Sequence, residues 1–81
     1  MYIDSFGKRY SLNEFNYYGL NNGDSVAYVV ELVIDMDIND FDEDEFRTPI
    51  VVGAESQFVL MGYTLNEWYE ESGAVKVVYV K

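Results

Sequence analysis

The sequence predicts an α+β domain: a mainly antiparallel sheet of four or five strands with two short helices on one face. Three observations lead to this prediction: one long stretch that alternates apolar and polar residues, several short stretches rich in Val and Ile, and a helix-start signal that occurs twice. A chain of 81 residues suffices for one domain, so we expect residues 1–81 to fold as a single unit.

The clearest strand signal is Val26–Ile38, in which every second residue is apolar without a break. Period two places these side chains on one face of a strand. The opposite face changes along its length from apolar to acidic. The sequence NNGD at 21–24 predicts a turn before this strand.

The other expected strands are short and rich in β-branched or aromatic residues. Residues 54–61 admit two structures, because AESQ favours a helix and FVLM a buried strand; we expect a strand in the second half. The predicted short strands are Tyr2–Phe6, Thr48–Val52, Phe58–Met61 and Val75–Val80.

The two predicted helices follow from a hexapeptide that occurs twice, YSLNEF at 10–15 and YTLNEW at 63–68. Each copy contains Ser/Thr-x-x-Glu, the capping box, in which the hydroxyl and the Glu side chain satisfy backbone N–H groups at a helix start. Helices are therefore expected to begin near Leu12 and Leu65. Glycines are common helix ends, so we expect these helices to end near Gly19 and Gly73.

The charge of the chain favours a basic binding partner. Fifteen Asp and Glu against five Lys and Arg give a formal net charge of −10. This charge repels nucleic acid and anionic lipid and attracts positively charged proteins. Its magnitude exceeds the ~2–8 that keeps a small domain soluble. Lys8 and Arg9 lie among aromatic residues, but two basic side chains are too few for direct nucleic-acid binding by a chain of this net charge.

Catalysis is not expected, because the chain has no His and no Cys. Triads, cysteine nucleophiles and the usual zinc sites need these residues. The glycines form no phosphate-binding loop, and we expect no cofactor. The lack of Cys, of a signal-peptide pattern and of an apolar run near ~20 residues predicts a cytoplasmic protein without a membrane segment.

Seven carboxylates lie within the eleven residues Asp35–Glu45, and no base interrupts them before Arg47. On a strand, Asp35 and Asp37 would share a face at a spacing of ~6.6–6.8 Å. That spacing is about two steps of ~3.4 Å between phosphates along one DNA strand. The interleaved Phe41 and Phe46 are apolar anchors for a partner or core residues.

A smaller acidic group lies on the second predicted helix, where Glu67 and Glu71 would share a helical face. Glu at a helix start also suits the helix dipole, so this group has a structural explanation too. The candidate partner-binding residues are Asp35, Asp37, Asp40, Asp42, Glu43, Asp44, Glu45, Glu67, Glu70 and Glu71.

Three interpretations of the acidic segment are open. It is a solvated surface that no partner contacts, as charge runs usually are; it is a contact surface for a basic protein, including one that normally binds nucleic acid; or it binds Ca²⁺ or Mg²⁺. Asp35-x-Asp37-x-Asn39 begins like an EF-hand loop. The match then fails, because Asp40 replaces the glycine at position six and Phe46 replaces the bidentate Glu at position twelve.

Along the segments NG at 22–23, VIDMD at 33–37 and DEDEF at 42–46, the chain resembles small acidic inhibitors of phages and mobile elements. These are the anti-CRISPR and DNA-mimic anti-restriction proteins. The resemblance covers about a third of the chain and rests on charge, size and Tyr content. It implies inhibition of a host nuclease by occupation of its nucleic-acid groove. The expected function is therefore a non-enzymatic acidic inhibitor; the alternatives are an assembly subunit held by apolar surface and a weak Ca²⁺ or Mg²⁺ module.

Overall fold

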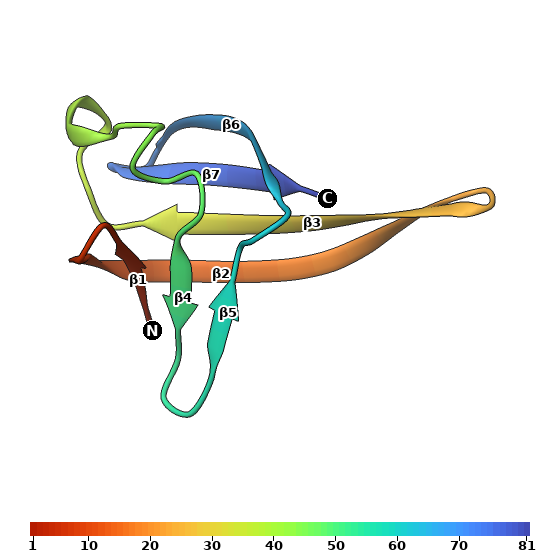
Figure 1. Ribbon diagram of the computed structural model, residues 1–81. Coiled ribbons are helices and arrows are strands. Elements are labelled where there is room, and N and C mark those ends of the chain that lie inside the picture. Colours follow the sequence, from red (N-terminus) through yellow and green to blue (C-terminus); the bar gives the residue numbers. More distant parts are fainter.

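The computed structural model describes residues 1–81, with the side chain of Asn22 excepted. The backbone forms a seven-stranded sheet in the order β5-β4-β1-β2-β3-β7-β6, in which all neighbours are antiparallel (Figure 1). The only helical element in the described chain is one 3₁₀ turn, η1 (Ile38–Asp40). The strands are β1 (Tyr2–Ser5), β2 (Lys8–Asn22), β3 (Ser25–Ile34), β4 (Ile50–Val52), β5 (Gln57–Val59), β6 (Thr64–Glu71) and β7 (Ala74–Val80).

The predicted α+β class is wrong, because both predicted helices are strands and the sheet has seven strands rather than four or five. The repeated hexapeptide lies in β2 and across the start of β6. In each copy the register with the neighbouring strand shifts within Leu-Asn-Glu, so that Asn13 and Asn66 are the extra residues of two β-bulges. A bulge brings a Leu and the aromatic residue three positions later to one face. That spacing also defines a helix face, which explains the wrong prediction.

The two glycines that were expected to end helices lie in a strand and in a hairpin turn. Gly19 lies inside β2, and Gly73 lies in the turn between β6 and β7. Ser72 and Gly73 both have positive φ, as do Phe6 and Gly7 between β1 and β2. Two consecutive positive φ angles are the geometry of the tight hairpin turn that matches the twist of the flanking strands. The hairpin β6–β7 therefore depends on a glycine that the sequence pattern assigned to a helix end.

The strand predictions are largely confirmed in position but not in length. Each of the four predicted short strands overlaps an observed strand. The turn predicted at 21–24 is shorter than expected: Gly23 and Asp24 connect β2 to β3, and Asn21 still pairs with Val26 inside the hairpin. The long strand predicted for Val26–Ile38 is wrong at its C-terminal end, since β3 stops at Ile34. Only Val30, Leu32 and Ile34 of its alternating apolar series belong to the fully buried core.

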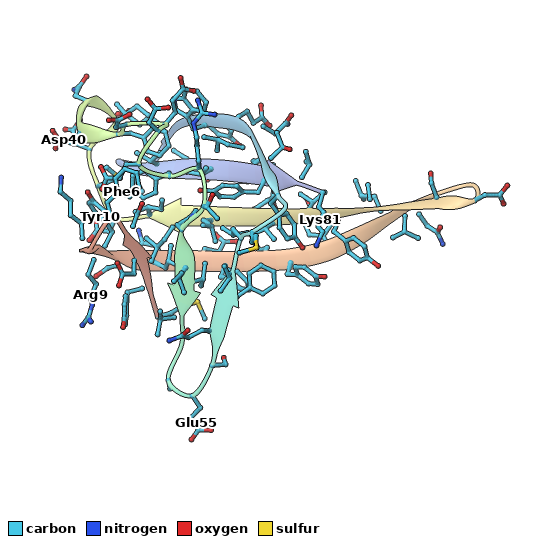
Figure 2. All side chains as sticks on the ribbon, in the orientation of Figure 1. Phe6, Arg9, Tyr10, Asp40, Glu55 and Lys81 are labelled. Carbon is cyan, nitrogen blue, oxygen red and sulfur yellow. The ribbon has the colours of Figure 1, made fainter. Side chains whose placement is uncertain are left out.

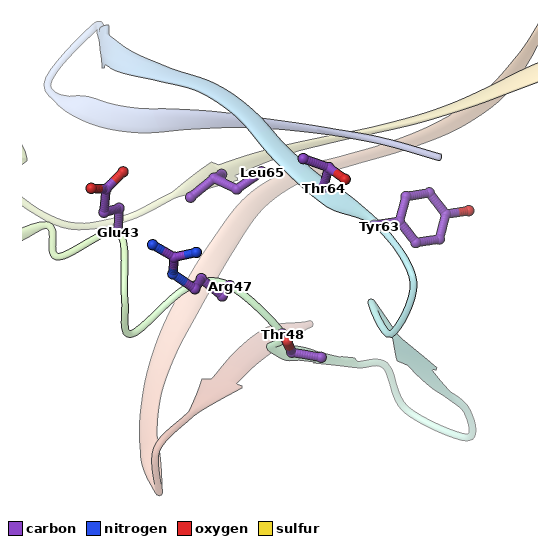
Figure 3. A pocket seen from close by; sticks show the side chains of 6 residues that line it. All are labelled: Glu43, Arg47, Thr48, Tyr63, Thr64 and Leu65. Atoms are coloured by element: carbon purple, nitrogen blue, oxygen red, sulfur yellow. The ribbon is translucent and has the colours of Figure 1, made fainter.

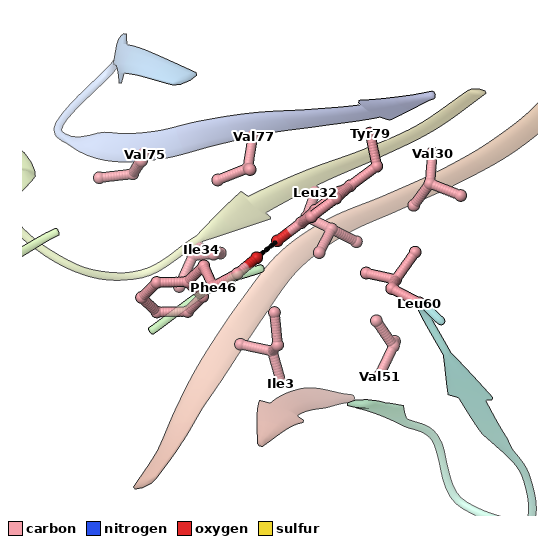
Figure 4. Packing of buried hydrophobic residues seen from close by; sticks show 10 residues of the cluster. All are labelled: Ile3, Val30, Leu32, Ile34, Phe46, Val51, Leu60, Val75, Val77 and Tyr79. Carbon is pink, nitrogen blue, oxygen red and sulfur yellow. Dashed lines mark hydrogen bonds between the residues drawn. The ribbon is translucent and has the colours of Figure 1, made fainter. Parts of the chain in front are cut away.

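The core lies between two parts of the sheet that fold over each other. Side chains of β3 and β7 approach from one side and Ile3, Val51 and Leu60 from the other (Figure 4). The hairpin β4–β5 crosses β2 and β3 (Figure 1), as in orthogonal sheet packing. Phe46, from the segment between β3 and β4, closes one end of this core. The hydroxyl of the buried Tyr79 donates a hydrogen bond of 2.6 Å to the carbonyl of Phe46.

At the other end, β2 and β3 extend past the core as a two-stranded arm (Figure 1). We call residues Tyr17–Tyr28 the arm. The molecule measures 39 × 28 × 21 Å along its principal axes. In the described chain, no helix has the length and apolar character required to cross a membrane.

Candidate functional site

The segment Asp35–Glu45, which we call the acidic loop, connects β3 to β4 and includes η1. It lies at the end of the molecule away from the tip of the arm, as the label of Asp40 in Figure 2 shows. The expectation that Asp35 and Asp37 share a strand face is wrong, because β3 ends before both of them. Their spacing therefore carries no argument about phosphate steps. Local turns determine the shape of the loop instead.

Asp37 organises the first turn. Its carboxylate accepts a hydrogen bond of 2.8 Å from the backbone N–H of Asn39, and its carbonyl accepts one of 3.0 Å from the N–H of Asp40. Asp is common in turns because its short side chain can accept a hydrogen bond from the backbone N–H two residues further along the chain. Asp37 thus has a structural role besides its charge.

Asp42 organises the second turn in the same way. Its carboxylate accepts a hydrogen bond of 3.0 Å from the N–H of Asp44, and its carbonyl accepts one of 3.1 Å from the N–H of Glu45. The carboxylate of Asp44 forms an ion pair of 2.9 Å with Arg47, in which both side chains are highly exposed. Exposed pairs of this kind contribute little stability, at most about 1 kcal/mol.

Two phenylalanines attach the loop to the core. Phe46 is fully buried, so its predicted role as a partner anchor is wrong and its alternative, a core residue, is confirmed. Phe41 is half-buried and stacks on Phe46 with ring centroids 4.9 Å apart. The ring of Phe41 also packs against that of Trp68 in β6, with ring centroids 5.6 Å apart. The loop is therefore packed against the sheet by an aromatic cluster, and its charges lie on a fixed frame.

Glu45 differs from the other acidic residues of the loop. It is only 8% exposed, and the Tyr10 hydroxyl donates a hydrogen bond of 2.8 Å to its carboxylate. The hydroxyl of Ser5 donates to the backbone carbonyl of Glu45. Burial raises the pKa of Tyr10 to about 12, with a further contribution from the hydrogen bond to Glu45. Glu45 is thus an internal link to β1 and β2, and the structure does not offer it to a partner.

The second acidic group lies on β6 rather than on a helix, and the structure divides it between two faces. Glu67 and Glu71 lie opposite Val78 and Ala74 of β7 on the outer face of the sheet, whereas Glu70 lies opposite the core residue Val75. Because alternate residues of a strand share a face, Glu70 lies on the same side as Trp68. Glu70 therefore adjoins the side that the acidic loop covers, and Glu67 and Glu71 do not.

The outer face of the sheet, which carries Glu67 and Glu71, also carries a basic residue, Lys76. Lys76 of β7 lies 3.5 Å from Glu31 of β3. Burial alone would lower the pKa of Lys76. The negative charge of Glu31, with smaller contributions from Tyr69 and Glu71, outweighs burial and raises this pKa. Part of the negative charge on this face is thus balanced. The unbalanced charge is concentrated in the acidic loop.

An open recess of about 270 Å³ lies between the acidic loop and the start of β6 (Figure 3). Glu43 and Arg47 stand on its loop side, and Thr64 and Leu65 on its strand side. A second hollow is the inner side of the β4–β5 turn and is lined by residues 52–57. Among the described residues, no group of three or more acidic side chains is placed to hold a metal ion.

Two residues of this region, Tyr10 and Trp68, were not assigned to the acidic site from the sequence. Tyr10 holds Glu45, and Trp68 connects β6 to the loop through Phe41. No local pattern reveals the first contact, because its partners are 35 positions apart in the chain. The direction of the Trp68 side chain depends on the bulge at Asn66, which only the pairing of β6 with β7 reveals.

No protein-family model, curated protein sequence or solved structure matches this chain.

Proposed function

We propose that the protein is a non-catalytic inhibitor whose acidic loop occupies a basic, nucleic-acid-binding site on a partner such as a host defence nuclease. The observation that carries this proposal is the fixed position of six exposed carboxylates on one loop, held by two turns and by the aromatic cluster. The six are Asp35, Asp37, Asp40, Asp42, Glu43 and Asp44.

Rigid placement of the charges supports binding better than a loose tail would. A flexible acidic tail must lose conformational freedom when it docks, and each immobilised side chain costs about 0.5–1.5 kcal/mol. In this loop the backbone is already ordered by Asp37, Asp42 and Phe46. Carboxylates in fixed positions can meet the Lys and Arg side chains that otherwise bind phosphates.

The carboxylates available to a partner differ from those that maintain the loop. Asp37 and Asp42 cap turns, and Asp44 pairs with Arg47. The described structure assigns no hydrogen bond or ion pair to the side chains of Asp35, Asp40 and Glu43. These three are the carboxylates that we expect a basic partner to contact first.

The test is a loop variant in which Asp35→Asn, Asp40→Asn and Glu43→Gln are combined. It removes charge without removing a turn cap or the aromatic cluster. Binding to a panel of purified restriction and CRISPR nucleases is measured at low and at physiological salt. We expect affinity to fall about tenfold, since exposed ion pairs contribute roughly 0.2–1 kcal/mol each and 1.4 kcal/mol is a factor of ten. Association is expected to slow most at low salt.

The matched control combines Glu14→Gln, Asp24→Asn and Glu55→Gln, which are exposed carboxylates elsewhere on the surface. Both variants lose three carboxylates, so they have equal net charge. We expect the control to bind like the unmodified protein. Equal weakening by both variants would assign the effect to net charge alone, and unchanged binding of the loop variant would exclude the loop; either result contradicts the proposal.

A further inference from the structure

The arm has a strand edge that no other strand of the described chain occupies. β1 pairs with β2 only along Lys8–Ser11, and Leu12 donates one more hydrogen bond to the carbonyl of Met1. Beyond that point β2 pairs with β3 alone, up to the turn at Gly23. The rest of β2 is therefore an open edge of the sheet.

The backbone groups of this edge point outwards. The N–H and C=O of Tyr28 both bond to Lys81 at the β7 side, at 3.2 and 2.9 Å. Since consecutive residues of a strand direct these groups to opposite sides, Tyr28 makes no ladder bond to β2. Gly19 lies directly opposite Tyr28, so its N–H and C=O point away from β3, and the same alternation applies to Tyr17 and Asn21.

The usual protections of a free edge are missing here. Sheet edges are normally blocked by charged side chains, by Pro or by very short strands. The edge strand β6 has Glu67, Glu70 and Glu71, and the edge strand β5 has three residues. The arm strand from Phe15 to Asn22 contains neither a charged residue nor a Pro.

The arm also exposes apolar side chains on both faces. Five of them are between 39% and 52% exposed: Tyr17, Tyr18, Leu20, Val26 and Tyr28. Tyr17 and Tyr28 stack with ring centroids 6.2 Å apart. Taking an aromatic side chain as ~150–250 Å², the arm presents roughly 400 Å² of apolar surface, and two arms ~800 Å². Pairing through the β2 edge covers only part of this surface, so the buried area stays below the ~1,000 Å² lower bound of a stable specific interface.

We propose that two copies of this chain associate through the open edge of β2, antiparallel and centred near Gly19, so that the two sheets become continuous. Charge supports a second copy in this position. Between Tyr17 and Tyr28 the only charged residue is Asp24. The acidic loops lie at the far ends of molecules 39 Å long, several times the ~8 Å Debye length at physiological salt. The area predicts a weak, concentration-dependent dimer.

Sedimentation velocity over a series of protein concentrations, at low and at high salt, tests this proposal. We expect a monomer–dimer equilibrium in which the dimer fraction rises with salt, because screening reduces repulsion between two acidic chains. Gly19→Pro removes an outward N–H, which an edge strand tolerates. Leu20→Lys adds a charge to the arm. Each change is expected to weaken association about tenfold.

Met61→Lys is the control, since Met61 is 72% exposed and lies outside the arm. It adds the same charge and is expected to leave the dimer intact. Circular dichroism checks that each variant is folded; if Gly19→Pro does not fold, Leu20→Lys decides the result. A protein that stays monomeric at every concentration overturns the proposal, as does a dimer that both arm variants retain. The salt response is opposite to that expected for the acidic loop, so the two proposals can fail separately.

Discussion

Deletion of Asn13 is expected to lower the free energy of unfolding by about 3–6 kcal/mol. Asn13 is the extra residue of the β2 bulge. Without it, one half of β2 must slip by one residue, and a slip of one residue turns side chains to the opposite face. Either Phe15 or both Tyr10 and Leu12, which pack partly buried against the core, then turn away from it, and Asn16 or Ser11 turns towards it. Roughly 1–3 kcal/mol of lost apolar burial and about 2–3 kcal/mol for a polar side chain turned inwards account for the expected loss.

Denaturant unfolding followed by circular dichroism measures this loss. The control is Asn13→Ala, which keeps the number of residues in the bulge and is expected to change stability by less than about 1 kcal/mol. The loss is comparable to the whole stability of a marginal domain, about 5 kcal/mol, so the deletion variant is expected to be partly unfolded in buffer. A deletion variant as stable as Asn13→Ala would show that the bulge does not set the register of β2.

Phe46→Ala is expected to cost about 3–5 kcal/mol, the usual cost of removing a buried aromatic ring. Phe46 is fully buried and contacts the rings of Tyr10 and Phe41, at centroid distances of 5.3 and 4.9 Å. Its loss opens a cavity at the end of the core and removes the support of Phe41. We therefore expect the acidic loop to loosen before the sheet unfolds.

Hydrogen exchange separates these two effects. The amides of Asn39 and Asp44, which donate to Asp37 and Asp42, are expected to exchange faster in Phe46→Ala than amides in the centre of β3. Phe6→Ala is the matched control, because Phe6 is 79% exposed, and its effect is expected to stay within about 0.5 kcal/mol. Uniform acceleration across the loop and the sheet would contradict the role of Phe46 as the anchor of the loop.

Sequence patterns located the strands where burial decides the structure. In β3 and β7, alternating or continuous apolar residues face the core on at least one side, and such patterns are read directly. The end of β3 was missed because Met36 and Ile38 continue the alternation but pack against the core from the loop. Met36 and Ile38 are therefore partly buried, as the alternation predicts, although neither belongs to β3.

The helices were predicted wrongly for a reason specific to two residues. The bulges at Asn13 and Asn66 convert the spacing of two residues into one of three, and the flanking Ser/Thr and Glu imitate a capping box. Only pairing with β3 and β7 reveals the bulges, and that pairing is not local in the sequence. The preference of these segments for a strand depends on tertiary contacts.

The sequence predicts that the acidic loop is charged and exposed, but not the different roles of its carboxylates. The exposure of the loop follows from its charge, since carboxylates are rarely buried without a partner. That Glu45 has such a partner in Tyr10, and that Asp37 and Asp42 cap turns, requires the folded chain. The face of Glu70 likewise depends on the bulge in β6.

A competition assay tests the central claim most directly. A nuclease from the panel that binds the protein is titrated with labelled double-stranded DNA at several fixed concentrations of the protein. Occupation of the DNA site predicts that the apparent dissociation constant for DNA rises in proportion to the protein concentration, and that the loop variant needs about tenfold more protein for the same rise. A ternary complex of nuclease, DNA and protein, with unchanged DNA affinity, would contradict the account.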